Sequence, residues 1–215
     1  MTPNPNWRKI PTRTERLEQW LRSRSEASFY DLWGETIDPE WLIFLAEMGD
    51  APKNQLVLAA CAVARLSLHL CSEEDIRPQI AAIETCEAWC QGGAATAEQV
   101  KEANANADAV YYAARDRHAE SHAANVFYCA NGATYSATYA AVARSSVPLR
   151  PDIIVLSTAN AAWWAMKVEI ESVSENLTNH DWCQVLCATI RKHIPFERPR
   201  PKGMTIWQRL ITEDP

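Results

Sequence analysis

Helix-start and helix-stop signals recur along this chain, and they constrain its fold more than any other feature. In the stretch DPEWLIFLAEMG, Asp38 is a favoured N-cap residue, Pro39 takes the first helical position, and Gly49 follows as a stop. Thr96 and Gln99 have the spacing of a capping box. The chain also holds 33 alanines against six glycines, and no segment has a convincing strand period. These observations predict an all-α fold.

The same signals divide the chain into about eight helices joined by short loops, as in a compact helical array. Pro52 is expected to open a helix that reaches about residue 71, and Pro78 to open the next, which Gly92 and Gly93 close. Five further helices are predicted. The first begins at the Thr12–Glu15 capping pattern, the second runs from Thr96 to Asn131, and the other three cover 134–145, 152–173 and 180–193.

The length of 215 residues and the hydrophobic fraction of 47% suit one domain with a sizeable core. We expect a single helical domain over residues 1–195, in which 1–11 form an N-terminal extension. The last stretch, 196–215, is Pro-rich and basic before a short amphipathic piece. We expect it to be an extended C-terminal arm that packs on the domain. A free tail that docks on a partner is the alternative.

Charge and apolar patterning argue against several classes of protein. The net charge is −6 and the pI about 5.4, which disfavours a nucleic-acid partner and suits a basic protein partner. No apolar run is long enough for a membrane span, and the N-terminus lacks a signal-peptide pattern. Seven cysteines without such a signal predict reduced thiols in the cytoplasm, and their odd number excludes a complete disulfide framework. The oligomeric state stays open.

The stretch CAVARLSLHLCSEEDIRPQIAAIETCEAWC holds four cysteines and one histidine, which raises the question of a metal site. Cys61 and Cys71 would lie almost three helical turns apart, too far to share one metal. Cys86 and Cys90 share a helix face but supply only two thiols, and no short-loop CxxC knuckle is present. Because free cysteine packs as a small hydrophobe, we interpret these thiols as core residues and expect no cofactor.

Arg65, His69 and Ser72 are polar exceptions on one stripe of a helix that is otherwise apolar on almost every side. A buried arginine requires a carboxylate or several carbonyls, because an unpaired buried charge is very costly. Two interpretations stay open, a structural ion pair that fixes helix register and a polar pocket. The candidate partners of this arginine are three carboxylates, Glu84, Asp108 and Asp116.

The segment RDRHAESHAANVFYC invites comparison with the zinc-protease motif HExxH. His118 and His122 have the spacing that one metal requires, but Glu120 falls on the opposite side of the helix and cannot act as the base. The histidines continue an apolar stripe that begins at Val100, which favours core histidines. A metal or catalytic pair completed from elsewhere, or a polar binding surface, remains the alternative.

Other catalytic templates are missing from the sequence. There is no GxSxG elbow, no P-loop and no GxGxxG, and no carboxylate lies in an apolar context that would tune it for acid–base work. Trp163 and Trp164 lie about 100° apart on one predicted helix. Either that helix is buried on two sides, or Trp164 is exposed and suited to an interface.

The run LVLAACAVARLSLHL, followed by IRPQIAAIETCEAWCQGGAATAEQVKEA, resembles the Imm-5-like family of immunity proteins. The family carries a motif like A-C-x-x-A-R-x-x-L, an acidic turn with R-P, and AIE-A-EAW before a helix opened by threonine. The resemblance extends over about 38–195, is strongest over 56–101, and departs at Cys86, where alanine is expected. The matching residues are Ala60, Cys61, Ala64, Arg65, Leu68, Arg77, Pro78, Ala82, Ile83, Glu84, Glu87, Ala88 and Trp89.

The resemblance implies an all-helical cytoplasmic protein that neutralises a cognate toxin of a bacterial polymorphic toxin system by direct binding. No catalytic activity and no cofactor would be needed, and the partner would be the toxin. A helical metal protein or enzyme that uses His118 and His122, and a helical adaptor, are the rival hypotheses. The candidates for toxin binding are the polar and aromatic residues Arg65, His69, Arg77, Glu84 and Trp164.

Overall fold

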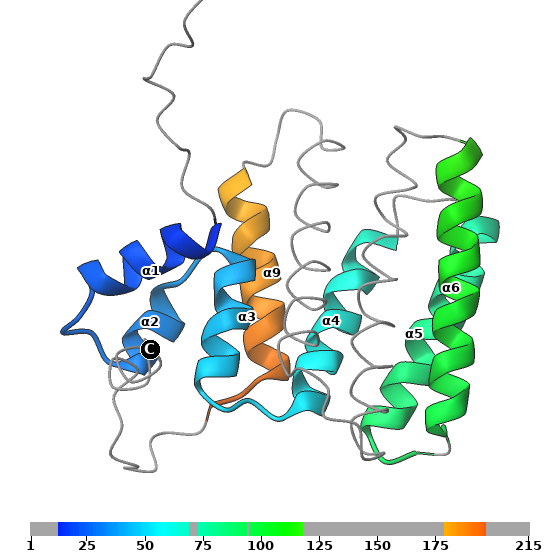
Figure 1. Cartoon of the computed structure of the whole chain (residues 1–215), viewed down its shortest axis with the longest axis horizontal. Helices are drawn as coiled ribbons and strands as arrows, with labels where there is room; N and C mark the ends of the chain where they lie inside the picture. Colours follow the sequence, from blue (N-terminus) through cyan, green and yellow to red (C-terminus); the bar gives the residue numbers. More distant parts are fainter. Residues whose placement is uncertain (1–12, 69–72, 94, 118–178, 197–215) are drawn as a thin grey trace, which may run out of the picture. The chain divides into compact units, whose positions relative to one another are not determined.

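The computed structural model describes residues 13–68, 73–93, 95–117 and 179–196, and all secondary structure in these ranges is helical (Figure 1). This confirms the all-α prediction. No helix in the described ranges is long and apolar enough to cross a membrane. The predicted helices over 134–145 and 152–173 lie outside the described residues, as does nearly all of the expected C-terminal arm.

The described helices belong to two compact units, the first with α1 and α2 and the second with α3 to α9. The boundary falls between Glu35 and Thr36. The helices are α1 (Arg13–Ser23), α2 (Phe29–Glu35), α3 (Pro39–Met48), α4 (Lys53–Ser67), α5 (Glu73–Cys90), α6 (Ala97–Arg117) and α9 (Asn179–His193).

The first unit contains a short helix, α2, that the sequence analysis missed. Ser28 and Asp31 form its capping box: the Asp31 backbone N–H donates to Ser28 Oγ over 3.2 Å, and the Ser28 N–H donates to Asp31 Oδ2 over 3.0 Å. Phe29 stacks on Trp33, with ring centroids 6.1 Å apart. Arg24 forms an ion pair with Glu35. Capping and aromatic contacts therefore support a helix of only seven residues.

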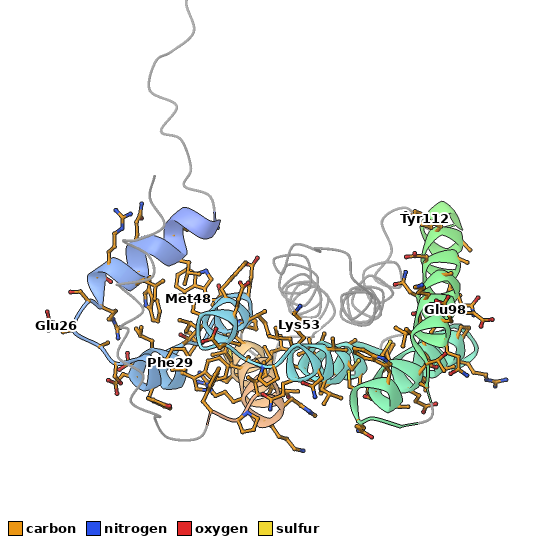
Figure 2. All side chains as sticks on the ribbon, turned by 60° about the horizontal axis from the view of Figure 1, so that its bottom comes forward. Glu26, Phe29, Met48, Lys53, Glu98 and Tyr112 are labelled. Atoms are coloured by element: carbon orange, nitrogen blue, oxygen red, sulfur yellow. The ribbon has the colours of Figure 1, made fainter. Side chains whose placement is uncertain are left out.

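The N-terminal signals of α3 act as predicted. Asp38 Oδ1 accepts hydrogen bonds from the backbone N–H groups of Glu40, over 2.9 Å, and Trp41, over 3.2 Å, and Pro39 is the first helical residue. These contacts satisfy donors that a helix start otherwise leaves unpaired. Figure 2 shows Met48 at the end of α3 and Lys53 at the beginning of α4, on either side of the connecting turn.

The stop of α3 differs in one detail from the prediction. Gly49 keeps a negative φ of −83°, and Asp50 adopts the left-handed conformation with a φ of 57°. The Asp50 N–H donates to the Glu47 carbonyl and the Ala51 N–H donates to the Ala46 carbonyl, both over 2.9 Å, which is a Schellman motif. The left-handed position therefore falls one residue after the glycine.

In the second unit, α9 packs against both α3 and α4, α4 packs against α5, and α5 packs against α6 (Figure 1). The described helices thus form a series of neighbours in the order α3, α9, α4, α5, α6. The burial of α4 on several sides confirms its predicted central place. Fully buried side chains along this series include Leu42, Ile43, Leu45, Val57, Ala60, Cys61, Ala64, Ile83, Leu186 and Ile190.

The prediction that Pro78 opens a helix is wrong, because α5 begins at Glu73 and Pro78 lies inside it. The segment EEDI before the proline suits a helix start, since acidic residues favour the positive end of the helix dipole. Proline in the second turn removes one backbone hydrogen bond, to the carbonyl of residue 74, and the rest of α5 is regular.

Both ends of the connection between α5 and α6 are fixed as predicted. Gly92 adopts a φ of +71° and donates to the Trp89 carbonyl over 3.2 Å, while Gly93 donates to the Ala88 carbonyl over 2.8 Å. This second Schellman motif ends α5. Thr96 then opens α6 through a reciprocal capping box with Gln99: the Thr96 N–H donates to Gln99 Oε1 over 2.8 Å, and the Gln99 N–H donates to Thr96 Oγ1 over 3.3 Å.

Candidate functional site

The structure places only some of the predicted site residues. Arg65 lies on α4, and Arg77 and Glu84 lie on α5. His69, His118, His122 and Trp164 lie outside the described residues. The site is therefore built from α4, α5 and their neighbour α6.

Arg65 binds Glu87 across the α4–α5 contact through two parallel hydrogen bonds. Arg65 Nε donates to Oε1 over 2.9 Å, and Nη2 donates to Oε2 over 2.7 Å. Glu84 is the more distant neighbour, 4.0 Å from Nη2. Of the predicted partners, Glu84 is thus a secondary one, and Asp108 instead accepts a hydrogen bond from Asn104. The partner that was not predicted, Glu87, lies three residues after Glu84, slightly less than one helical turn.

The two-point contact stabilises the charged form of Arg65. The hydrogen bonds that Arg65 donates to the Glu87 carboxylate raise the pKa of Arg65, against the opposing effect of burial. The side chains remain 37% and 25% exposed, so the pair is neither fully buried nor fully solvated. Of the two interpretations of Arg65, this geometry supports the ion pair that fixes the register of α4 against α5.

Three of the five described thiols pack in the core as predicted, whereas Cys90 on α5 and Cys183 on α9 are half-buried. Cys61, Cys86 and Cys187 are fully buried, and the described cysteines are free of disulfides. A hydrogen bond with Cys86 and burial raise the pKa of Cys61 well above its ordinary value, so the Cys61 thiol stays protonated. Among the described residues, no three His, Cys, Asp or Glu side chains come together as a metal site would require.

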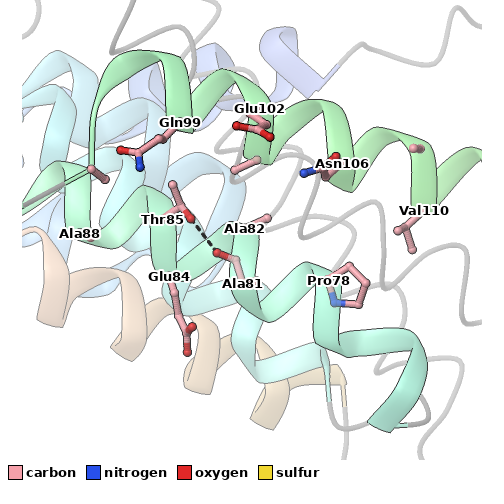
Figure 3. A pocket seen from close by; sticks show the side chains of 13 residues that line it. Pro78, Ala81, Ala82, Glu84, Thr85, Ala88, Gln99, Glu102, Asn106 and Val110 are labelled. Carbon is pink, nitrogen blue, oxygen red and sulfur yellow. Dashed lines mark hydrogen bonds between the residues drawn. The ribbon is translucent and has the colours of Figure 1, made fainter.

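A groove of about 910 Å³ lies between α5 and α6 (Figure 3). Six of its lining residues are alanines, of which Ala82 and Ala103 are buried and form its deepest part. The Thr85 hydroxyl donates to the Ala81 carbonyl over 2.9 Å, so its hydrogen is committed to the backbone. The lining residues are Pro78, Ala81, Ala82, Glu84, Thr85, Ala88, Ala95, Gln99, Glu102, Ala103, Asn106, Ala109 and Val110.

The groove is open to solvent and carries negative charge. Seven of its thirteen lining residues are exposed, among them Glu84 on α5 and Glu102 on α6. Among the described residues, no lysine, arginine or histidine lines it. The nearby Lys101 forms an ion pair with Glu98 over 2.7 Å. The charged residues of its described lining are therefore Glu84, with Arg65 Nη2 4.0 Å away, and Glu102.

Arg77 lies outside the lining of the groove, seven residues before Glu84 on α5, where its side chain is exposed. Two helical turns separate these residues by about 10 Å, roughly one Debye length at moderate salt. Of the predicted binding residues, the structure thus brings Glu84 to the groove, places Arg65 beside Glu84, and leaves Arg77 apart.

No family model, curated protein or solved structure matches this chain. A functional proposal for this chain therefore draws on its own residues and on the motif resemblance described from the sequence. The sequence analysis missed the α6 side of the groove, formed by Gln99, Glu102 and Asn106. Their spacing of three and four residues, opposite an alanine-rich stretch of the preceding helix, is the signal that marks one polar edge.

Proposed function

We propose that this chain is a non-enzymatic immunity protein that binds a cognate bacterial toxin in the cytoplasm and blocks it. The proposal comes from the resemblance to the Imm-5-like family. The observation that best supports it is the difference in burial among the motif residues. Ala60, Cys61 and Ala64 are buried on α4, whereas Glu84 is exposed on α5 at the groove.

This arrangement supports binding rather than catalysis. The motif holds α4 against α5 through buried small side chains and through the Arg65–Glu87 pair. Because its guanidinium is bound to Glu87, Arg65 has a structural role here. A rigid two-helix scaffold of this kind presents a fixed surface, and preorganisation lowers the entropic cost of association. Inhibition by such a protein would work by covering the active surface of the toxin.

Charge gives the proposed complex a means of rapid association. The chain carries a net charge of −6, and the described lining of the groove holds two glutamates and no cation. A basic toxin would be attracted over long range, which raises the association rate at low salt. We therefore expect a partner of net positive charge.

Growth rescue tests this function directly. The toxic domain encoded beside this chain is expressed under an inducible promoter, with or without this chain, and colony counts are compared. An unrelated toxin of similar potency serves as the control. Rescue from the neighbouring toxin alone supports the proposal. If the neighbouring toxin still kills the cells while this chain is soluble and in excess, the proposed function is wrong for that pair.

A further inference from the structure

We propose that the groove between α5 and α6 receives an amphipathic helix of the toxin, with basic residues on both flanks of an apolar stripe. This inference rests on the proposed function and identifies the surface that performs it. It commits to one occupant, a basic helical segment of the partner protein.

The dimensions of the groove suit a helix. On α5 the lining extends from Pro78 to Ala88, which corresponds to about 15 Å or three helical turns. The base consists of methyl groups, because alanines line both helices and Thr85 has its hydroxyl hydrogen bonded to the backbone. Small side chains allow another helix to approach closely and to insert larger apolar residues, as in helix-in-groove recognition.

The charges of the groove define the flanks of the occupant. Glu84 lies on α5, with its carboxylate directed away from α6, and Glu102 lies on α6 (Figure 3). Glu84 is 63% exposed, and the nearest guanidinium, Arg65, already forms two hydrogen bonds with Glu87. Both glutamates are therefore available to a cation that arrives from solvent. A helix with lysine or arginine on each side of its apolar stripe satisfies both of them at once.

Two features of the rim add specificity without charge. Gln99 and Asn106 are exposed on α6 on either side of Glu102; the Gln99 Oε1 accepts from the Thr96 N–H, which leaves its NH2 group to donate, and the Asn106 amide can donate and accept. Backbone and side-chain groups at the edge of a docked helix would find partners there, which fits a polar rim around an apolar centre.

Two groove variants and two matched controls test the inference on the full chain. Glu84→Lys with Glu102→Lys reverses both rim charges, and Glu26→Lys with Glu98→Lys makes the same change in net charge at exposed sites outside the groove. Ala81→Trp fills the groove from an exposed position, and Ala188→Trp places the same bulk on exposed α9. Circular dichroism confirms that each variant stays helical.

The probe is the toxic domain encoded beside this chain, measured by growth rescue and by titration at two salt concentrations. We expect the charge reversal to weaken the Kd by about tenfold or more and to flatten its salt dependence, while its control stays within about twofold. We expect Ala81→Trp to abolish rescue and Ala188→Trp to retain it. If the wild-type chain rescues growth and both groove variants do so equally well, the groove inference fails and the proposed function stands.

Peptides then identify the occupant. Overlapping 15-residue peptides from the toxic domain, and one covering residues 196–215 of this chain, are titrated against the wild type and Ala81→Trp. A basic toxin peptide that binds only the wild type supports the inference. Binding by this chain's own peptide alone, or self-association that Ala81→Trp removes while rescue persists, overturns it. Failure of the wild-type chain to rescue growth overturns the proposed function, and the groove inference with it.

Discussion

Replacing Glu87 with glutamine should destabilise the second unit, because it leaves the half-buried guanidinium of Arg65 without its two-point partner. The pair makes hydrogen bonds of 2.7 and 2.9 Å, and its side chains are 37% and 25% exposed. Exposed pairs contribute about 0.2–1 kcal/mol, and breaking a fully buried pair costs about 3–5 kcal/mol. After discounting for solvent screening, we expect a cost of about 1–2 kcal/mol.

A double-mutant cycle measures the coupling between these side chains. Arg65→Met, Glu87→Gln and the double variant are unfolded in urea, and the midpoints are compared at constant m value. For a chain of this size, a loss of 1–2 kcal/mol corresponds to a decrease in Tm of about 2–8 °C. A second cycle with Glu84→Gln is the internal control, because Glu84 is 63% exposed and 4.0 Å away. We expect its coupling to Arg65 to stay below about 0.5 kcal/mol.

The two cycles together can refute the argument. If the Arg65–Glu84 coupling equals or exceeds the Arg65–Glu87 coupling, the two-point hydrogen bond does not decide how this arginine is held. If neither cycle shows coupling, the contact between α4 and α5 depends on apolar packing alone, and the role assigned to the ion pair in fixing helix register is wrong.

Three further outcomes follow from local structure. Gly92→Ala should cost about 1 kcal/mol in urea unfolding because of its φ of +71°, whereas Gly34→Ala, with open space around it, should be neutral or stabilising. Burial lowers the pKa of His193 below 6.5, so the folded state binds fewer protons than the unfolded chain. The free energy of unfolding should therefore be highest above about pH 6.5 and should decrease as the pH falls through the folded pKa. Urea unfolding of His193→Gln should not show this pH-dependent decrease. Burial raises the pKa of Cys187 to about 12, so iodoacetamide at pH 8 should label it only after unfolding, as read by mass spectrometry.

Local signals in the sequence predicted local structure well. Asp38, Thr96 and Gly92 act as caps because the hydrogen bonds that they complete lie within a few residues, so no distant contact has to be known. The burial of α4 on several sides also followed from its apolar residues on every side. Short α2 was missed because seven residues give too little periodicity to detect.

Contacts between helices were harder to predict. Glu84 and Glu87 are separated by less than one turn, and which of them meets Arg65 depends on the rotation and translation of α5 against α4. Pro78 was misplaced for a similar reason, since a proline near a helix start is compatible with either the first or the second turn. The groove required knowledge of the α5–α6 packing, which single-chain periodicity does not contain.

The position of α9 between α3 and α4 has a consequence for how the protein is made. Arg191 donates to the Thr36 carbonyl across 155 residues of sequence, so one of the principal contacts of the second unit has very high contact order. During synthesis, α5 and α6 can pack together as soon as both have emerged from the ribosome. The contacts of α9 with α3 and α4 cannot form until α9 has been translated. At an elongation rate of about 20 residues per second this interval lasts several seconds, and during it the exposed apolar surface makes the nascent chain prone to aggregation.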